Sequence, residues 1–241
     1  MDRRRFLGSA GALAFVIPGL ATGEDRPART RIGLLRQRLP TVNALCAESE
    51  RAANLGRMYR LIAARQASRP RCELLIFGDL PLTGHRYDWR RDDLQRLAIE
   101  VPGEESLVLG RAARDHDCHV VFGALARDAD WPGELLHITT ILDANGEIAG
   151  RHWMRRSLRD QCGSALDSFN MNVSTMHNRR AAYVAMYGAE ALYPVTRTAV
   201  GNIAVGGMHF EPQFERLVRA RGARWLLGGV AGYRPVTPLP G

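Results

Sequence analysis

The chain has 241 residues, of which 46% are hydrophobic and 24% are charged, and this composition excludes a disordered or fibrous protein and fits one globular domain with a sizeable core. The formal net charge is +8, and every basic residue other than histidine is arginine, because the sequence contains no lysine. The arginines are scattered among acidic residues and are not gathered on one helix face, so we expect a basic surface and no nucleic acid partner.

The first 23 residues have the pattern of an export signal. A charged start that includes Arg3 and Arg4 is followed by a weakly apolar run over residues 8–20 and by small residues up to Gly23. The run is too short to remain as a membrane anchor. The paired arginines ahead of Phe6 resemble a twin-arginine signal, which implies export to the periplasm and cleavage near Gly23. A basic start without structure is the alternative.

Strands and helices alternate along the rest of the chain. Short apolar runs predict strands at residues 31–35, 74–77, 119–125, 136–142, 147–152, 203–205 and 225–227, and helical spacing predicts helices at residues 43–67, 104–115, 183–193 and 214–221. Residues 159–180 are polar and irregular and are predicted to form a long loop. This order predicts a layered α/β fold, with one domain over residues 30–232 and a proline-rich tail over residues 233–241.

The four cysteines define no obvious framework. Cys46, Cys72, Cys118 and Cys162 are irregularly spaced and contain no C-x-x-C pair, so neither a zinc site nor a particular disulfide pattern is predicted. In an oxidising compartment one or two bridges can form. Their connectivity does not follow from the sequence.

Three short motifs occur in the order expected of one enzyme family. An acidic residue, Asp79, follows the strand at residues 74–77; the segment Gly146-Glu-Ile-Ala-Gly-Arg-His-Trp-Met-Arg155 follows a hairpin turn; and residues 201–212 read as a strand that turns through Gly206 and Gly207 into a helix. In this order they resemble the nitrilase superfamily, the carbon-nitrogen hydrolases that include amidases and nitrilases. The resemblance extends over about residues 31–229 and implies a four-layer α-β-β-α sandwich. Members of the family continue well beyond the last motif, so we expect a sandwich that is shortened at its C-terminal end.

The catalytic residues of the family are a glutamate base, a lysine that stabilises the oxyanion and a cysteine nucleophile. The resemblance places Asp79 at the glutamate position, Met154 at the lysine position and Met208 at the cysteine position. An aspartate is one methylene shorter, and a thioether provides neither an ammonium charge nor a thiolate. Arg155 or Arg151 is a candidate substitute for the missing charge, although a guanidinium differs from an ammonium in shape.

Other residues have simpler interpretations. Asp79 is either a residual base or ligand contact, or a turn residue that caps the following segment. Met208 is expected to pack in the core or pocket wall, and His209 to pack beside it. A displaced nucleophile at Cys162 and a metal site at residues 115–119 are weak candidates, so no metal and no cofactor is predicted. Glu190 is either a surface residue or a contact behind the site.

Three functions follow from this pattern. The first is a non-catalytic nitrilase-like protein in the periplasm that binds a small amide, nitrile or carboxylate, or that pairs with a second copy or a partner subunit. The second is an amide or nitrile hydrolase with a rearranged site that uses Asp79 and Arg155. The third is a decayed, truncated gene product without a selected function.

Overall fold

The computed structural model describes residues 30–35, 39–86, 88–156, 172–206 and 212–228. Its strands are β1 (Ile32–Leu35), β2 (Leu74–Phe77), β3 (Ile99–Glu100), β4 (His119–Arg127), β5 (Leu136–Leu142), β6 (Ile148–Trp153), β7 (Ile203–Gly206) and β8 (Trp225–Gly228). Its helices are α2 (Ala47–Ala67), α3 (Arg91–Leu97), α4 (Glu104–Asp115), α7 (Arg180–Tyr187) and α8 (Pro212–Ala220), with 3-10 helices η1 (Ala44–Cys46) and η2 (Ala189–Leu192).

A six-stranded mixed sheet forms the centre of the molecule. Its order is β1-β2-β4-β5-β6, and β3 pairs with the far end of β4. The pairs β1–β2 and β2–β4 are parallel, whereas β4–β5 and β5–β6 are antiparallel. The hairpin from β5 to β6 turns at Gly146, which has a φ of +84°. Because β5 pairs with β4, and β4 with β2, the polar residues after β2 lie close to the first residues of β5.

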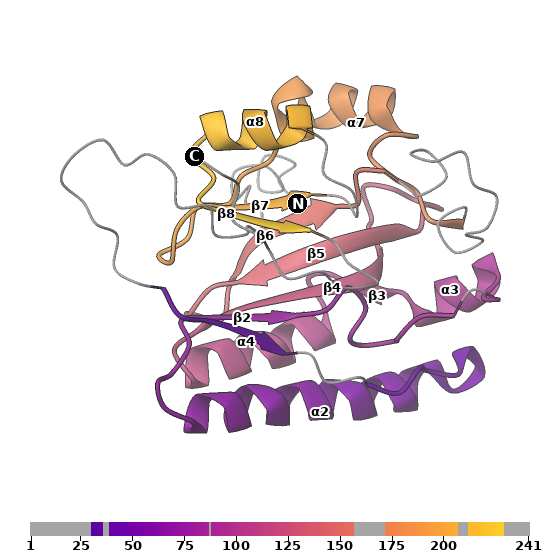
Figure 1. The fold of residues 1–241 in the computed structure, drawn as a ribbon. Coiled ribbons are helices and arrows are strands. Elements are labelled where there is room, and N and C mark those ends of the chain that lie inside the picture. Colours follow the sequence, from indigo (N-terminus) through magenta and orange to yellow (C-terminus); the bar gives the residue numbers. More distant parts are fainter. Residues whose placement is uncertain (1–29, 36–38, 87, 157–171, 207–211, 229–241) are drawn as a thin grey trace.

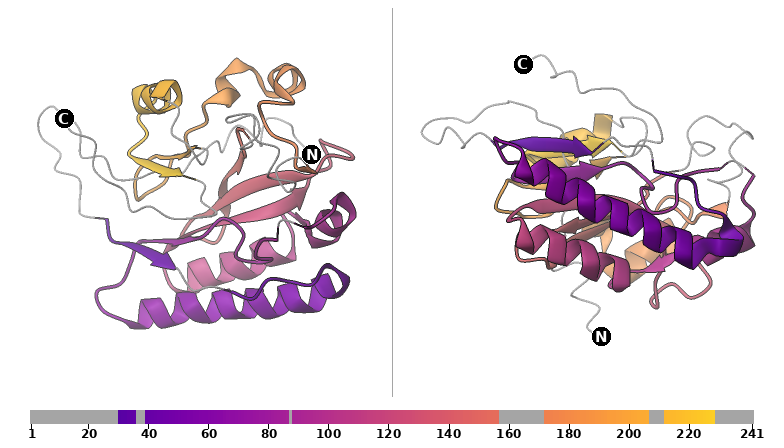
Figure 2. Two further views of the ribbon diagram at one scale, coloured as in Figure 1. Left: turned by 45° about the vertical axis from the view of Figure 1, so that its right-hand side comes forward. Right: turned by 90° about the horizontal axis from the view of Figure 1, so that it is seen from below.

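Two long helices cover one face of this sheet. Helices α2 and α4 lie side by side across it (Figure 2, right). Their apolar side chains, which include Met58, Ile62 and Leu109, pack against sheet residues such as Val120 and Phe122 and are essentially inaccessible to solvent. Burial of this apolar area is the main stabilising contribution to this half of the fold.

A second, two-stranded sheet lies on the other face. Strands β7 and β8 are parallel, and α8 connects them. Leu74, Val121 and Ile141 of the large sheet form one core with Ile203 and Leu226 of the small sheet. Helices α7 and α8 lie outside the small sheet, so the layers follow the order helix, sheet, sheet, helix (Figures 1 and 2). The α-β-β-α arrangement predicted from the sequence is therefore present.

Most of the predicted elements are confirmed, one predicted helix has different limits, and two short elements were not predicted. The helix predicted at residues 183–193 is wrong in its limits: α7 begins at Arg180 and ends at Tyr187, because Gly188 adopts a φ of +83° and starts a separate 3-10 turn. Helix α3 and strand β3 were not predicted. Most of the predicted loop at residues 159–180, the export signal and the tail at residues 233–241 lie outside the described residues.

Among the described residues no helix is long and apolar enough to cross a lipid bilayer.

Candidate functional site

Asp79 stands at the carboxyl end of β2, where the sequence places it. Gly123 of β4 lies directly beside it, with its N–H donating to the Gly78 carbonyl at 3.4 Å. A Cβ atom on Gly123 would be 1.8 Å from the carbonyl oxygen of Asp79, so only glycine permits this close approach of the two backbones. The Asp79 side chain is 12% exposed. The fold thus holds this carboxylate in a narrow, largely buried position.

A buried histidine on β5 is the partner of Asp79. The Nε2 atom of His137 lies 2.9 Å from Oδ1 of Asp79, and the histidine side chain is 4% exposed. Burial alone lowers the pKa of a histidine, but the negative charge of Asp79 and hydrogen bonding with it outweigh burial, so the pKa of His137 is raised above its usual value. Asp79 is therefore the charged partner of a buried histidine.

Met154 follows β6 and is fixed beside the same histidine. Its N–H donates to the carbonyl of His137 at 2.8 Å, and its own carbonyl accepts from the N–H of Met176 at 2.9 Å. Strand β5 thus connects Asp79 and Met154, which the resemblance assigns to the family's glutamate and lysine positions, through His137. At the second position the chain presents a partly buried thioether, which has no charge and no exchangeable proton.

Arg155 turns toward the small sheet. Its guanidinium lies over the rings of Phe214 and Tyr193, with the Cζ atom 4.4 and 5.1 Å from the two centroids. It also donates to the carbonyl of Leu192 and lies 3.8 Å from the sulfur of Met176. These contacts join β6 to α8 and η2. Arg155 therefore already has a structural role between aromatic rings, which weakens the interpretation that it replaces a catalytic ammonium.

Arg151 is held in a different place. It donates to the carbonyl of Val101 and lies 3.4 Å from a carboxylate oxygen of Asp128. Burial lowers the pKa of Arg151, and the charge of Asp128 opposes this effect. Val101 and Asp128 lie in the segments that follow β3 and β4.

The strand-to-helix turn within residues 201–212, called the elbow from here on, is described at both of its ends. Strand β7 ends at Gly206 and helix α8 begins at Pro212, as the sequence predicts for a strand that turns into a helix. Met208 and His209 lie outside the described residues, as does Cys162. Phe214 in the first turn of α8 contacts Arg155, so the segment after Met154 and the start of the elbow helix are close together.

Two weaker candidates, the group at residues 115–119 and Glu190, lie in the described part of the chain. Helix α4 ends at Asp115 and β4 begins at His119, so His116 and His119 do not share a helix face. No group of three or more histidine, cysteine or acidic side chains suited to a metal occurs among the described residues. Glu190 forms an ion pair with Arg221, which also donates to two backbone carbonyls near η2. Glu190 is thus a surface residue that anchors the end of α8.

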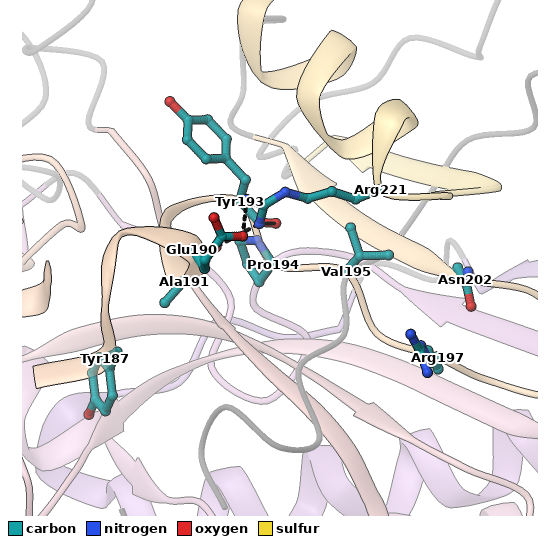
Figure 3. Close-up of a pocket in the computed structure, with 9 residues that line it drawn as sticks. All are labelled: Tyr187, Glu190, Ala191, Tyr193, Pro194, Val195, Arg197, Asn202 and Arg221. Carbon is teal, nitrogen blue, oxygen red and sulfur yellow. Dashed lines mark hydrogen bonds and ion pairs between the residues drawn. The ribbon is translucent and has the colours of Figure 1, made fainter. Parts of the chain in front are cut away.

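One hollow of about 270 Å³ opens beside η2, at the end of the small sheet opposite the elbow. Figure 3 shows Glu190 and Arg221 joined across it, with Asn202 and Arg197 toward the other side. None of Asp79, His137 and Met154 lines this hollow. It is therefore separate from Asp79 and Met154, the described residues that the resemblance places at the family's glutamate and lysine positions.

Comparison with known proteins identifies the family. Residues 36–223 match the family described as carbon-nitrogen hydrolase, so the chain belongs to the carbon-nitrogen hydrolases of the nitrilase superfamily. A comparison with curated proteins gives no match.

Solved structures share the fold at low sequence identity. A carbon-nitrogen hydrolase from Helicobacter pylori G27 is 13% identical with a TM-score of 0.59, and the alignment covers 83% of this chain and 59% of that one. Saccharomyces cerevisiae Nit3, a member of branch 10 of the nitrilase superfamily, is 14% identical with a TM-score of 0.52, and the alignment covers 74% and 58% of the two chains. The chain therefore spans less than two thirds of the length of these relatives.

Proposed function

We propose that this protein is a non-catalytic member of the carbon-nitrogen hydrolase family that binds a small amide, nitrile or carboxylate without hydrolysing it. The observation that carries the proposal is the pair of residues around His137. The acidic residue at the base position is in a buried ion pair, and the residue at the oxyanion position is a methionine whose backbone is bonded to the same histidine.

The chemistry of the family needs three groups, and each is altered here. A base takes the proton of a thiol, the thiolate attacks the substrate carbon, and an ammonium stabilises the negative charge that develops. Met154 offers no charge, and the chain has no lysine that an alternative alignment could bring to this position. Met208 stands at the nucleophile position and forms no thiolate. A site of this composition lacks the groups for acyl transfer, and the role that we propose for it is binding.

The described cysteines do not offer a replacement nucleophile beside Asp79. Cys72 precedes β2, whereas Asp79 follows it, and Cys118 precedes the neighbouring strand β4. Burial raises the pKa of both thiols, which makes the reactive thiolate scarce at neutral pH. Cys46 is exposed on η1.

A second candidate function is an altered hydrolase. It is favoured by one observation, the contact of 2.9 Å between His137 and Asp79, because a histidine held by a carboxylate is a common base in enzymes that use a serine or cysteine nucleophile. This candidate requires a nucleophile that enters the site from another segment.

An ammonia-release assay separates the two candidates. The purified protein is incubated with short amides, nitriles and N-carbamoyl compounds, with Asp79→Ala as the matched control. The proposal predicts ammonia release at the background rate for both proteins. Turnover well above background that disappears in Asp79→Ala would establish the altered hydrolase.

Binding is tested in parallel by thermal unfolding with the same compounds and with small carboxylates. A ligand that binds only the folded state raises the unfolding midpoint, and at one hundred times its Kd the stabilisation is about 2.7 kcal/mol. We expect such a rise for at least one class of compound and a smaller rise in Asp79→Ala. If no compound shifts the midpoint at millimolar concentration, the ligand-binding part of the proposal is wrong.

We also propose that the protein is exported and acts in the periplasm as an oligomer of its own copies or with a partner subunit. The N-terminal pattern of paired arginines, apolar run and small residues supports export.

A further inference from the structure

The hollow beside η2 is a second place where the fold offers space for a small molecule. Its volume is about 270 Å³, and it is lined by residues from the end of α7, from η2, from the segment between Tyr193 and Arg197, and by Asn202 and Arg221. It lies at the amino end of β7, whereas the elbow follows the carboxyl end. Pockets for drug-sized molecules are about 300–1,000 Å³, so this hollow is suited to a smaller compound.

A tight hairpin brings Arg197 and Asn202 together at one end of the hollow. Thr196 and Ile203 exchange both backbone hydrogen bonds, at 2.9 and 2.8 Å, so Arg197 and Asn202 are the next opposed pair in this antiparallel hairpin. Side chains of directly opposed residues point to the same face, with Cβ atoms about 4.5–5.5 Å apart. Figure 3 shows the two side chains close to each other. A cation and an amide are therefore presented at the same point.

Both side chains of this pair have hydrogen-bond donors to spare. Arg197 is exposed and forms no ion pair or hydrogen bond with the part of the chain that the structure describes. The Nδ2 atom of Asn202 donates to the carbonyl of Gly222 at 3.0 Å, which leaves its second N–H for a ligand. A guanidinium has five N–H donors in a planar fork and no acceptor, and this shape matches a carboxylate. This end of the hollow therefore offers donors and a positive charge to an anion.

The other end of the hollow is electrically balanced. Arg221 donates to the backbone carbonyls of Glu190 and Tyr193, at 2.7 and 3.0 Å, and forms an ion pair with the Glu190 carboxylate. Of the three charged residues that line the hollow, two thus neutralise each other and Arg197 is left uncompensated. Between the two ends the wall is apolar, with Pro194 and Val195 (Figure 3).

We propose that this hollow binds a small organic carboxylate, with the carboxylate group on Arg197 and Asn202 and a short apolar chain against Pro194 and Val195. A neutral amide or nitrile leaves the charge of Arg197 without a counter-charge and is bound more weakly. The site is separate from the one around His137. The inference therefore holds whether or not that other site binds or hydrolyses a ligand.

A series of carboxylates tests both parts of the proposed ligand. The full chain is titrated at low ionic strength with acetate, propanoate, butanoate and pentanoate, with pentanamide as the neutral reference and inorganic phosphate as an anion without an apolar chain. Binding is followed through the N–H signals in NMR spectra. We expect pentanoate to shift the side-chain amide signals of Asn202, and the affinity to rise by about two- to fourfold with each added methylene. Pentanamide should bind about tenfold more weakly than pentanoate.

Variants locate the binding at this hollow. Arg197→Gln removes the charge, and because Arg197 is exposed and without a partner in the described structure, the fold should be unaffected; we expect about a tenfold loss of pentanoate affinity. Arg197→Lys keeps the charge without the planar fork and should lose less. Arg216→Gln is the matched control, because Arg216 is exposed on α8 and does not line the hollow. It should bind pentanoate like the wild type, and so should Asp79→Ala, which alters the other site.

Several results would overturn the inference. One is the absence of any shift of the Asn202 signals at high millimolar pentanoate, and another is wild-type affinity in Arg197→Gln. Pentanamide that binds as tightly as pentanoate would rule out the carboxylate, and phosphate that binds at least as tightly would rule out the apolar chain. Loss of pentanoate binding in Asp79→Ala would assign the carboxylate to the site around His137 instead.

Discussion

The Nε2 atom of His137 lies 2.9 Å from Oδ1 of Asp79, and the carbonyl of His137 accepts a hydrogen bond from the N–H of Met154. Asp79 and Met154, which the resemblance places at the family's base and lysine positions, thus meet at one buried histidine. The proposed function rests on this relationship.

The Asp79–His137 pair predicts a particular dependence of stability on pH. Because the folded-state pKa of His137 is raised, the stability that its protonation contributes is fully present below the unfolded pKa near 6.5 and is lost as the pH rises through the folded pKa. Asp79→Asn removes the charge that raises this pKa and keeps the shape of the side chain. The difference in free energy of unfolding between wild type and Asp79→Asn should therefore be largest below about pH 6.5 and should shrink at higher pH.

Denaturant titrations of the two proteins from pH 5 to pH 9 measure this difference. His152 is buried and its pKa is lowered to about 3 by burial, so it destabilises the fold as the pH falls below 6.5. This effect is common to both proteins and cancels in the comparison. A difference in free energy of unfolding that stays constant, or that grows with pH, would show that Asp79 does not raise the pKa of His137.

Gly123 should be essential for the position of Asp79. In Gly123→Ala the new Cβ would overlap the carbonyl oxygen of Asp79, so we expect a loss of about 1–3 kcal/mol or more in the free energy of unfolding. Gly78→Ala is the matched control, because it is adjacent to Asp79 in the chain and a Cβ there has no heavy atom within 4 Å. Equal stability of the two variants in chemical unfolding would contradict the close approach of β4 to Asp79.

Arg155 should act as a structural cation. In Arg155→Lys the planar group between Phe214 and Tyr193 is lost, and we expect about 1 kcal/mol of destabilisation in thermal or chemical unfolding and no gain of amide hydrolysis. Arg111→Lys, at an exposed position of α4, is the control and should be close to neutral. Hydrolysis that appears in Arg155→Lys would instead assign this position to the oxyanion site.

The proposed export predicts that the mature protein is shorter than the full chain, because the signal is removed near Gly23. When the full gene is expressed in a bacterium with the twin-arginine pathway, we expect periplasmic protein whose N-terminus, determined by mass spectrometry, lies near residue 24. Replacement of Arg3, Arg4 and Arg5 by lysine should leave the precursor in the cytoplasm. Recovery of periplasmic protein that still begins at Met1 would rule out cleavage near Gly23.

Local patterns in the sequence were sufficient to predict the main strands and helices and the order of the layers that they form. The strands at residues 74–77 and 136–142 and the helix at residues 104–115 are delimited by apolar runs and polar ends, and the structure has the same limits. Helix α3 was missed because it is short and highly charged, although Asp92 and Asp93 in its first turn and the buried pair Leu94 and Leu97 are helix signals.

The partner of Asp79 did not follow from the sequence. His137 lies in a run of apolar residues and threonines, and its role depends on the register of β5 against β4 and on the distance from β2, which are properties of non-local pairing. A single histidine within an otherwise buried strand was the available signal. The direction of Arg155 was likewise unpredictable, because it depends on how α8 and η2 pack over β6.

The most direct test of the central claim is intact-mass spectrometry of the purified protein during incubation with activated acyl substrates of the family type, such as amides, esters and nitriles at millimolar concentration. Because neither Met154 nor Met208 can hold an acyl group, we predict an unchanged mass at every time point. A stable acyl adduct that maps by peptide sequencing to a side chain around Asp79 and His137 would contradict the assignment of this protein as non-catalytic.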